Sequence, residues 1–272
     1  MQIWAVINQK GGVGKTTTTA NLGAGLARHG KRVLLIDMDP QANLSLHLDV
    51  DVHQEMASIY GVLRGEHPAG KALRATGTDQ LDLLPSNIDL SGVEIELVNE
   101  VGREMILRDA LQQDQVLRER GYDYVVIDCP PSLGLLAVNA LTAADSVLIP
   151  VQSEFFALQG MGKLMQVVEL VRHRLNPRLT VAAIVMCMFQ GNTNLAREVV
   201  AEVKRFFGDK VMAATIRQNI KLAEAPSHGQ TIFQYAPGSN GALDYDQLAR
   251  EFLERFSAPA ASAAKARAAD AV

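Results

Sequence analysis

The chain has 272 residues, of which 48% are hydrophobic and 21% charged, and its formal net charge at pH 7 is −4. This composition is that of a globular protein with one large or two small domains, and it excludes a disordered chain, a collagen-like fibre and a small disulfide scaffold. No apolar run approaches the ~20 residues that span a bilayer. No basic segment precedes the first apolar run, and Cys129 and Cys187 lie in segments expected to be buried, so we expect a reduced, cytoplasmic setting without a signal peptide.

Short apolar runs alternate with longer helical patterns along the chain. Strands are predicted at residues 3–7, 33–36, 81–84, 124–127, 146–151, 181–188 and 211–216. Helices are predicted at 16–28 and at about 89–118, 133–143, 156–174, 193–207 and 242–256. Continuous apolar strands that alternate with helices predict an α/β fold, with a mostly parallel, twisted sheet flanked by helices on both faces. Because no linker divides the chain, we expect one domain over 1–257 and a mobile, alanine-rich tail over 258–272.

The segment between the first predicted strand and the first predicted helix is rich in glycine and lysine. Residues 8–17 read NQKGGVGKTT. Glycines let backbone N–H groups converge on phosphate oxygens, and the helix N-terminus adds the positive end of its dipole. We expect Lys15 to reach the β- and γ-phosphates and the Thr16 hydroxyl to bind Mg²⁺. The usual pattern, GxxxxGK[ST], requires a glycine where this chain has Gln9, so the loop is a lysine-bearing variant.

Acidic residues follow two of the predicted strands. Asp37 and Asp39 follow the strand at 33–36, and Asp128 follows the strand at 124–127. Ligands in open α/β sheets bind at the carboxyl ends of the strands. We therefore expect Asp128 to contact Mg²⁺ directly or through water, Asp37 to support the metal less directly, and Asp39 to orient the water that attacks the γ-phosphate. Each of them alone is equally typical of a helix cap or a turn.

These motifs resemble those of the ParA/MinD ATPases. Residues 10–17, 37–41 (DMDPQ) and 128–132 (DCPPS) look like the deviant Walker A, A′ and B motifs of that family. Residues 150–160 (PVQSEFFALQG) and 224–229 (EAPSHG) are similar to segments of its Soj-like ParA branch. The resemblance covers about residues 2–256 and implies a P-loop NTPase-like fold. It also implies ATP hydrolysis to ADP with Mg²⁺ and a homodimer in the ATP state.

The resemblance assigns roles to individual residues. Lys10 is expected to cross the dimer to the partner's phosphates, Lys15 to hold the phosphates of its own subunit, and Asp39 to serve hydrolysis, so these three form the catalytic set. The nucleotide is expected to contact Lys10, Gly11, Gly12, Val13, Gly14, Lys15, Thr16, Thr17 and Asn219. The expected metal set is Thr16, Asp37 and Asp128.

Positive charge is concentrated in one stretch near the C-terminus. Residues 172–221 hold nine Lys or Arg and three acidic residues, a net of +6 in a chain whose total is −4. The asymmetry indicates a polyanion-binding side, with a solvated charged face as the alternative. The resemblance implies nonspecific double-stranded DNA binding by the ATP dimer, at the nucleoid, and a ParB-like partner that stimulates hydrolysis. The expected DNA contacts are Arg197, Lys204, Arg205, Lys210, Arg217 and Lys221.

One segment departs from the family pattern. Related proteins usually carry Ile-Pro-Arg-Asn where residues 216–219 read Ile-Arg-Gln-Asn. Asn219 matches a position that contacts adenine, whereas Arg217 stands in place of a proline that packs near the base and Gln218 in place of an arginine. The packing around the base and one DNA contact are therefore left open, including whether Arg217 takes over the DNA contact.

Three other functions share parts of this pattern. A MinD-like ATPase at the membrane needs bulky apolar residues on a C-terminal amphipathic helix, which residues 258–272 lack. A nitrogenase-reductase-like protein needs cysteines placed to bridge an iron–sulfur cluster, whereas both cysteines here are typical of a core. A ParA relative that positions a non-DNA cargo over the nucleoid has the same motifs, and the sequence leaves it open.

Overall fold

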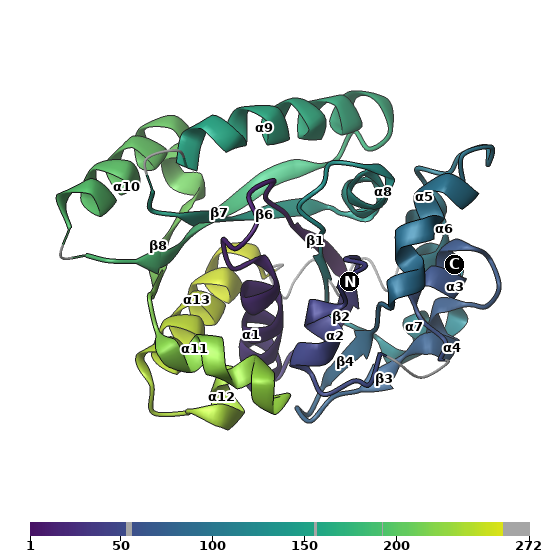
Figure 1. Cartoon of the computed structure of the whole chain (residues 1–272), viewed down its shortest axis with the longest axis horizontal. Helices are drawn as coiled ribbons and strands as arrows, with labels where there is room; N and C mark the ends of the chain where they lie inside the picture. The colour runs from purple at the N-terminus through teal and green to yellow at the C-terminus, as the bar shows by residue number, and fades with distance from the viewer. Residues whose placement is uncertain (53–55, 155–156, 192, 258–272) are drawn as a thin grey trace, which may run out of the picture.

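The computed structural model describes residues 1–52, 56–154, 157–191 and 193–257. Its centre is one eight-stranded sheet with the order β3-β4-β2-β5-β1-β6-β7-β8 (Figure 1). The strands are β1 (Gln2–Val6), β2 (Val33–Asp37), β3 (Arg74–Ala75), β4 (Leu81–Leu84), β5 (Tyr124–Asp128), β6 (Ser146–Gln152), β7 (Thr180–Phe189) and β8 (Val211–Arg217). The pairs are parallel except for β3 with β4. The predicted mostly parallel α/β fold is confirmed.

The helices connect and cover these strands. They are α1 (Lys15–Arg28), α2 (Asn43–His47), α3 (Ile59–Leu63), α4 (Ala69–Ala72), α5 (Val93–Glu96), α6 (Ile106–Gln113), α7 (Gln115–Arg120), α8 (Leu135–Ala143), α9 (Ala157–Arg174), α10 (Asn194–Phe207), α11 (Ile220–Glu224), α12 (Ile232–Tyr235) and α13 (Asn240–Phe256). Short 3₁₀ turns are η1 (Ile88–Gly92), η2 (Gly208–Lys210) and η3 (Ala225–His228). All predicted strands are present, with small shifts of their bounds.

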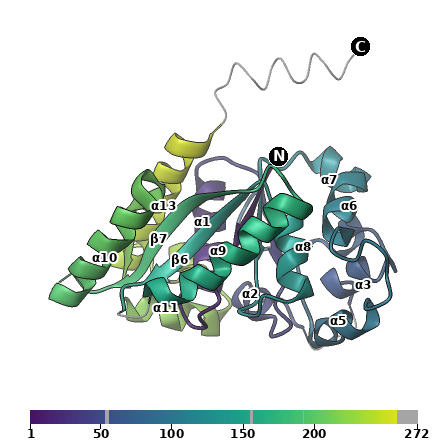
Figure 2. The ribbon, with the colours of Figure 1, turned by 90° about the horizontal axis from the view of Figure 1, so that it is seen from above.

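Both faces of the sheet are covered, which explains why the central strands are apolar at every position. Ile3 and Ala5 of β1 pack into the cluster that includes α8 and α9, whereas Trp4 and Val6 pack into the cluster that includes α1 and α13. Successive side chains of a strand point to opposite faces, so a strand between two helical layers needs apolar residues throughout. Figure 2 looks down on α9 and α10, which lie over the β6–β7 part of the sheet.

The helix predicted over about 89–118 is wrong as one element. The structure has η1, α5, α6 and α7 there, with a loop between α5 and α6. Gly102 in this loop has a φ of 77°, outside the helical region. Asp114 is the N-cap of α7: its backbone is extended, and its side chain accepts a hydrogen bond from the Leu117 N–H at 3.0 Å. This extended residue separates α7 from α6.

The expectations for the membrane, the C-terminal tail and the cysteines have separate outcomes. Within the described residues, no helix is long and apolar enough to cross a membrane. Residues 258–272, expected to form a tail, lie outside the described residues. Cys129 and Cys187 are buried thiols as predicted, although Cys129 lies one residue beyond β5.

Candidate nucleotide-binding site

The loop between β1 and α1 has the backbone shape that a phosphate site requires. Gly12 and Gly14 have φ values of 74° and 91°, a region that favours glycine. Gly14 precedes α1 and caps it without any side-chain hydrogen bond. The N–H groups of the first turn of α1 are therefore left for a ligand, and the helix dipole favours an anion there.

Lys15, the first residue of α1, is buried behind this loop. Its side chain lies among acidic groups, since Asp128, Cys129 and Asp39 all act on its charge. Burial is the largest effect and lowers the pKa of the ammonium, while the three acidic groups oppose that shift. The Nζ atom donates a hydrogen bond to the Lys10 carbonyl at 3.4 Å, which holds the ammonium under the loop.

Asp128 and Thr16 meet at the end of β5. The Thr16 hydroxyl donates to Asp128 Oδ2 at 2.7 Å, and the Thr19 hydroxyl donates to Oδ1 at 3.3 Å. Burial, followed by the neighbouring charge of Asp37, raises the pKa of Asp128 to about 8. Mg²⁺ prefers oxygen ligands, and the Asp128 carboxyl and the Thr16 hydroxyl converge beside the phosphate loop. A divalent cation there would also offset the repulsion between the Asp37 and Asp128 carboxylates. These residues therefore fit a magnesium ion.

Asp37 is the last residue of β2, and Asp39 lies two residues beyond it. Strand β2 pairs with β5, which places Asp37 beside Asp128. Asp37 is fully buried, and its Oδ2 accepts hydrogen bonds from the N–H and hydroxyl of Ser45 at 2.9 and 2.7 Å. Its Oδ1 accepts the Asp39 N–H at 3.1 Å. Burial raises its pKa to about 6, while the Ser45 bonds oppose the shift. Asp37 thus fixes the backbone that carries the half-buried Asp39.

Lys10 lies on the outer side of the loop. Its Nζ forms an ion pair with Glu154 and donates to Gln152 Oε1 at 3.4 Å, both at the end of β6. Its backbone N–H donates to Asn8 Oδ1 at 3.0 Å. The Lys10 and Glu154 side chains are 40% and 52% exposed, so the pair is open to solvent. The motif alone does not indicate this contact with Glu154.

A cavity of about 280 Å³ extends from the loop toward the C-terminal part of the chain. Gly14 and Thr17 line it from the loop and α1, and Arg217, Gln218 and Asn219 line it from the segment between β8 and α11. Asn219 also caps α11, because its side chain accepts the Lys221 N–H at 2.8 Å. The structure thus brings Asn219 to the same cavity as the phosphate loop, from about two hundred residues away in sequence.

Comparisons with known proteins agree with this geometry. A family profile described as an AAA domain matches residues 1–181. The chain is 47% identical over 250 residues to the sporulation initiation inhibitor protein Soj of Bacillus subtilis, covering 92% of this chain and 97% of Soj. It is 48% identical over 256 residues to the chromosome partitioning protein ParA of Caulobacter vibrioides, covering 94% and 95%.

The chain belongs to the ParA/Soj family of partitioning ATPases. The crystal structure of cobyrinic acid a,c-diamide synthase from Mycobacterium smegmatis, with bound ATP analogue and magnesium, is similar at a TM-score of 0.79 and 36% identity. The match covers 93% of this chain and 95% of that one. The predicted family, fold and ATPase class are confirmed.

The six residues predicted to contact DNA are all exposed. They gather around the β8 edge of the sheet, on α10, η2, the end of β8 and α11 (Figure 1). Three of them form ion pairs with acidic side chains: Arg205 with Glu202, Arg217 with Asp244 and Lys221 with Glu224. In the described part of the chain, Arg197, Lys204 and Lys210 have no such ion pair, which leaves their charge available.

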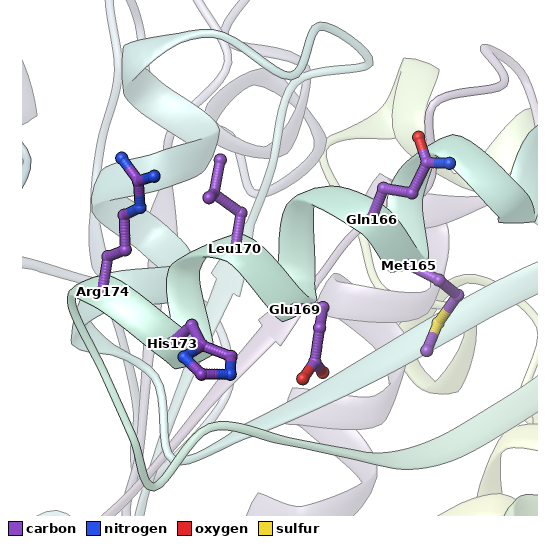
Figure 3. A pocket seen from close by; sticks show the side chains of 6 residues that line it. All are labelled: Met165, Gln166, Glu169, Leu170, His173 and Arg174. Carbon is purple, nitrogen blue, oxygen red and sulfur yellow. The ribbon is translucent and has the colours of Figure 1, made fainter.

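A second hollow, on α9, contains none of the predicted site residues. It is lined by Met165, Gln166, Glu169, Leu170, His173 and Arg174 (Figure 3). All six come from one helix, and Glu169 is already paired with Arg172 at 2.6 Å. The hollow therefore offers no converging set of polar groups, unlike the cavity beside the phosphate loop.

Proposed function

We propose that this chain is a magnesium-dependent ATPase that dimerises with ATP, binds double-stranded DNA without sequence preference and drives DNA segregation at the nucleoid. A ParB-like partner stimulates its hydrolysis. The observation that carries the proposal is that the phosphate loop and Asn219 share one cavity, while buried Lys15 and the Thr16–Asp128 pair lie beside the same loop. The names of the 47–48% identical relatives support the segregation role.

The phosphate end of the site holds and neutralises the triphosphate. The N–H groups at the start of α1 and the Lys15 ammonium bind phosphate oxygens, since both are fixed before the ligand arrives. Thr16 and Asp128 hold Mg²⁺, which supplies the charge that offsets the β- and γ-phosphate oxygens. Asp39, positioned by its backbone bond to Asp37, orients the attacking water.

Lys10 takes part only when two chains meet. In the single chain it is paired with Glu154, and both side chains are largely solvated. An exposed ion pair contributes about 0–1 kcal/mol, which is small beside the attraction of a triphosphate. Lys10 therefore leaves Glu154 at little cost when a partner's phosphates come within reach, and this makes hydrolysis depend on the dimer.

DNA binding uses the basic side chains around the β8 edge. Arg197 and Lys204 lie on the same helix, two turns apart, and so present their charges on one side of α10. Lysine and arginine contacts to phosphates carry no sequence information, and each contact adds to the salt dependence of the affinity.

The test is DNA affinity of the full-length protein with ATP, ADP or no nucleotide across a salt series. We expect sequence-independent binding with ATP only, and a steep loss of affinity with salt. Charge reversal by Lys204→Glu is expected to weaken this binding severalfold. Lys71 is also exposed and lies on α4, near the opposite edge of the sheet, so Lys71→Glu is the matched control and is expected to retain DNA binding. Binding that is absent in all three nucleotide states would overturn the DNA part of the proposal.

A further inference from the structure

The end of strand β8 is held by one carboxylate of α13. Asp244 accepts the Arg217 N–H at 2.9 Å, and the Arg217 guanidinium donates to the same carboxylate from Nε at 3.0 Å and from Nη2 at 2.6 Å. The Asp244 side chain is 7% exposed and that of Arg217 is 45% exposed. A buried carboxylate with both backbone and bidentate guanidinium donors is among the strongest kinds of polar contact.

A second carboxylate of the same helix makes a related contact farther along β8. Glu251 accepts the N–H groups of Ala213 and Ala214, each at 2.7 Å. Asp244 and Glu251 are seven residues apart, so they lie on one face of α13. Because β8 is the edge of the sheet, these acids bond N–H groups that no further strand covers. If Asp244 and Glu251 served only to bond the free N–H groups of this edge strand, the two residues would have the same role.

Asp244 differs from Glu251 in what lies beside it. Arg217 and the next three residues line the cavity that begins at Gly14 and Thr17, and so does Tyr245, the neighbour of Asp244. The Tyr245 hydroxyl is hydrogen-bonded to that of Thr18 at 3.1 Å, which ties α13 to α1. The Arg217–Asp244 pair therefore joins two walls of the cavity, the end of β8 and helix α13.

The backbone bond requires a residue other than proline at position 217. A proline at position 217 has no N–H, so it cannot make the 2.9 Å bond that Asp244 accepts. The arginine supplies this N–H and two further donors to the same acid. The residue at 217 and the acid at 244 thus work as one unit.

We propose that the Arg217–Asp244 pair positions the base pocket of the ATP site, so that it sets affinity and selectivity for the purine. This inference rests on the proposed binding of ATP with its base near Asn219. Arg217 and Asp244 are positioning residues that hold the 217–220 wall in place against α13, and the Arg217 guanidinium is engaged with the Asp244 carboxylate.

The experiment compares Asp244→Ala with Glu251→Ala in the full-length protein with magnesium. Binding of ATP, of GTP and of inorganic tripolyphosphate, which has no base, is measured by calorimetry, and KM and kcat are measured for ATP. For Asp244→Ala we expect the ATP Kd and KM to rise roughly 10- to 100-fold. Tripolyphosphate affinity and kcat should stay unchanged, and the preference for ATP over GTP should fall.

The controls separate positioning from stability. Glu251→Ala removes a similar contact to the edge strand away from the cavity, so it is expected to lower the melting temperature without changing ATP affinity. Asp244→Asn, which keeps an acceptor for the Arg217 N–H, is expected to give a smaller loss of ATP affinity and serves if the alanine variant does not fold.

Two results would overturn the inference: unchanged ATP affinity in Asp244→Ala, or equal losses for ATP and tripolyphosphate. The ATP-binding part of the proposed function fails separately, if Lys15→Ala still binds ATP normally.

Discussion

A buried histidine makes the stability of this protein depend on pH. His47, at the end of α2, is 1% exposed, and within the described residues its Nε2 has no hydrogen-bond partner. The ring also makes a hydrogen bond to the backbone of Gln230. Burial lowers the pKa of the imidazole from 6.5 to about 4, because a charged ring would lose its hydration.

The sign and the size of the effect follow from this shift. Between pH 6.5 and about 4 the unfolded chain binds a proton at His47 that the folded chain excludes. The free energy of unfolding therefore falls as the pH falls through this window. At about pH 5 the unfolded imidazole is mostly charged and the folded one mostly neutral, which corresponds to a loss of roughly 2 kcal/mol relative to neutral pH.

The prediction is tested with His47→Gln, which keeps a polar side chain but cannot titrate. Urea unfolding at about pH 7.5 and about pH 5 gives the loss of stability on acidification for each protein. We expect that loss to be smaller by roughly 2 kcal/mol in His47→Gln than in the unchanged chain. His173→Gln is the control, since His173 is exposed on α9 and its solvation changes little on unfolding. An equal loss in His47→Gln and the unchanged chain would refute the reasoning.

Three further predictions concern the phosphate end of the site. Lys15→Ala is expected to raise the ATP Kd at least 100-fold, measured by calorimetry, because it removes the buried cation beside the phosphates; normal affinity would contradict the assignment. Asp39→Ala is expected to bind ATP but not hydrolyse it and to give a persistent dimer by light scattering, whereas a monomer with ATP would count against it. Gly14→Ala places a Cβ at a φ of 91°, so we expect about 1–2 kcal/mol lower stability in urea unfolding and weaker ATP binding, and an unchanged unfolding midpoint would argue against strain.

The sequence was sufficient for elements with a strong local signal. The central strands are apolar at every position because helices cover both faces, and an unbroken apolar run of this length is visible in the sequence itself. Short elements such as α2, α4 and β3 have too few residues for a period to appear. The predicted helix at 89–118 failed because its interruptions, Gly102 and the Asp114 cap, are single residues within an otherwise helical pattern.

The candidate site also contains residues that a local motif predicts and contacts that no local motif predicts. Lys15, Thr16 and Asp128 could be named as candidates from sequence because the chemistry of phosphate binding requires these residue types at a helix start and a strand end. The structure brings the three together. The contacts that hold this site were not predictable in the same manner. Ser45 bonds Asp37 from eight residues away, and Asp244 bonds Arg217 from twenty-seven, and no local pattern encodes such pairs.

The C-terminal third of the chain supplies most of the residues that line the cavity beside the phosphate loop. The family profile ends at residue 181, yet the cavity wall opposite Gly14 begins at Cys187 and continues to Tyr245. This wall is attached to α1 itself, since Asn21 accepts the Ile232 N–H at 2.7 Å and Thr18 is bonded to Tyr245. Helix α1, which begins at the phosphate loop, is therefore also bonded to α12 and α13. In the proposed binding mode, the phosphates and the base both contact segments that are bonded to α1.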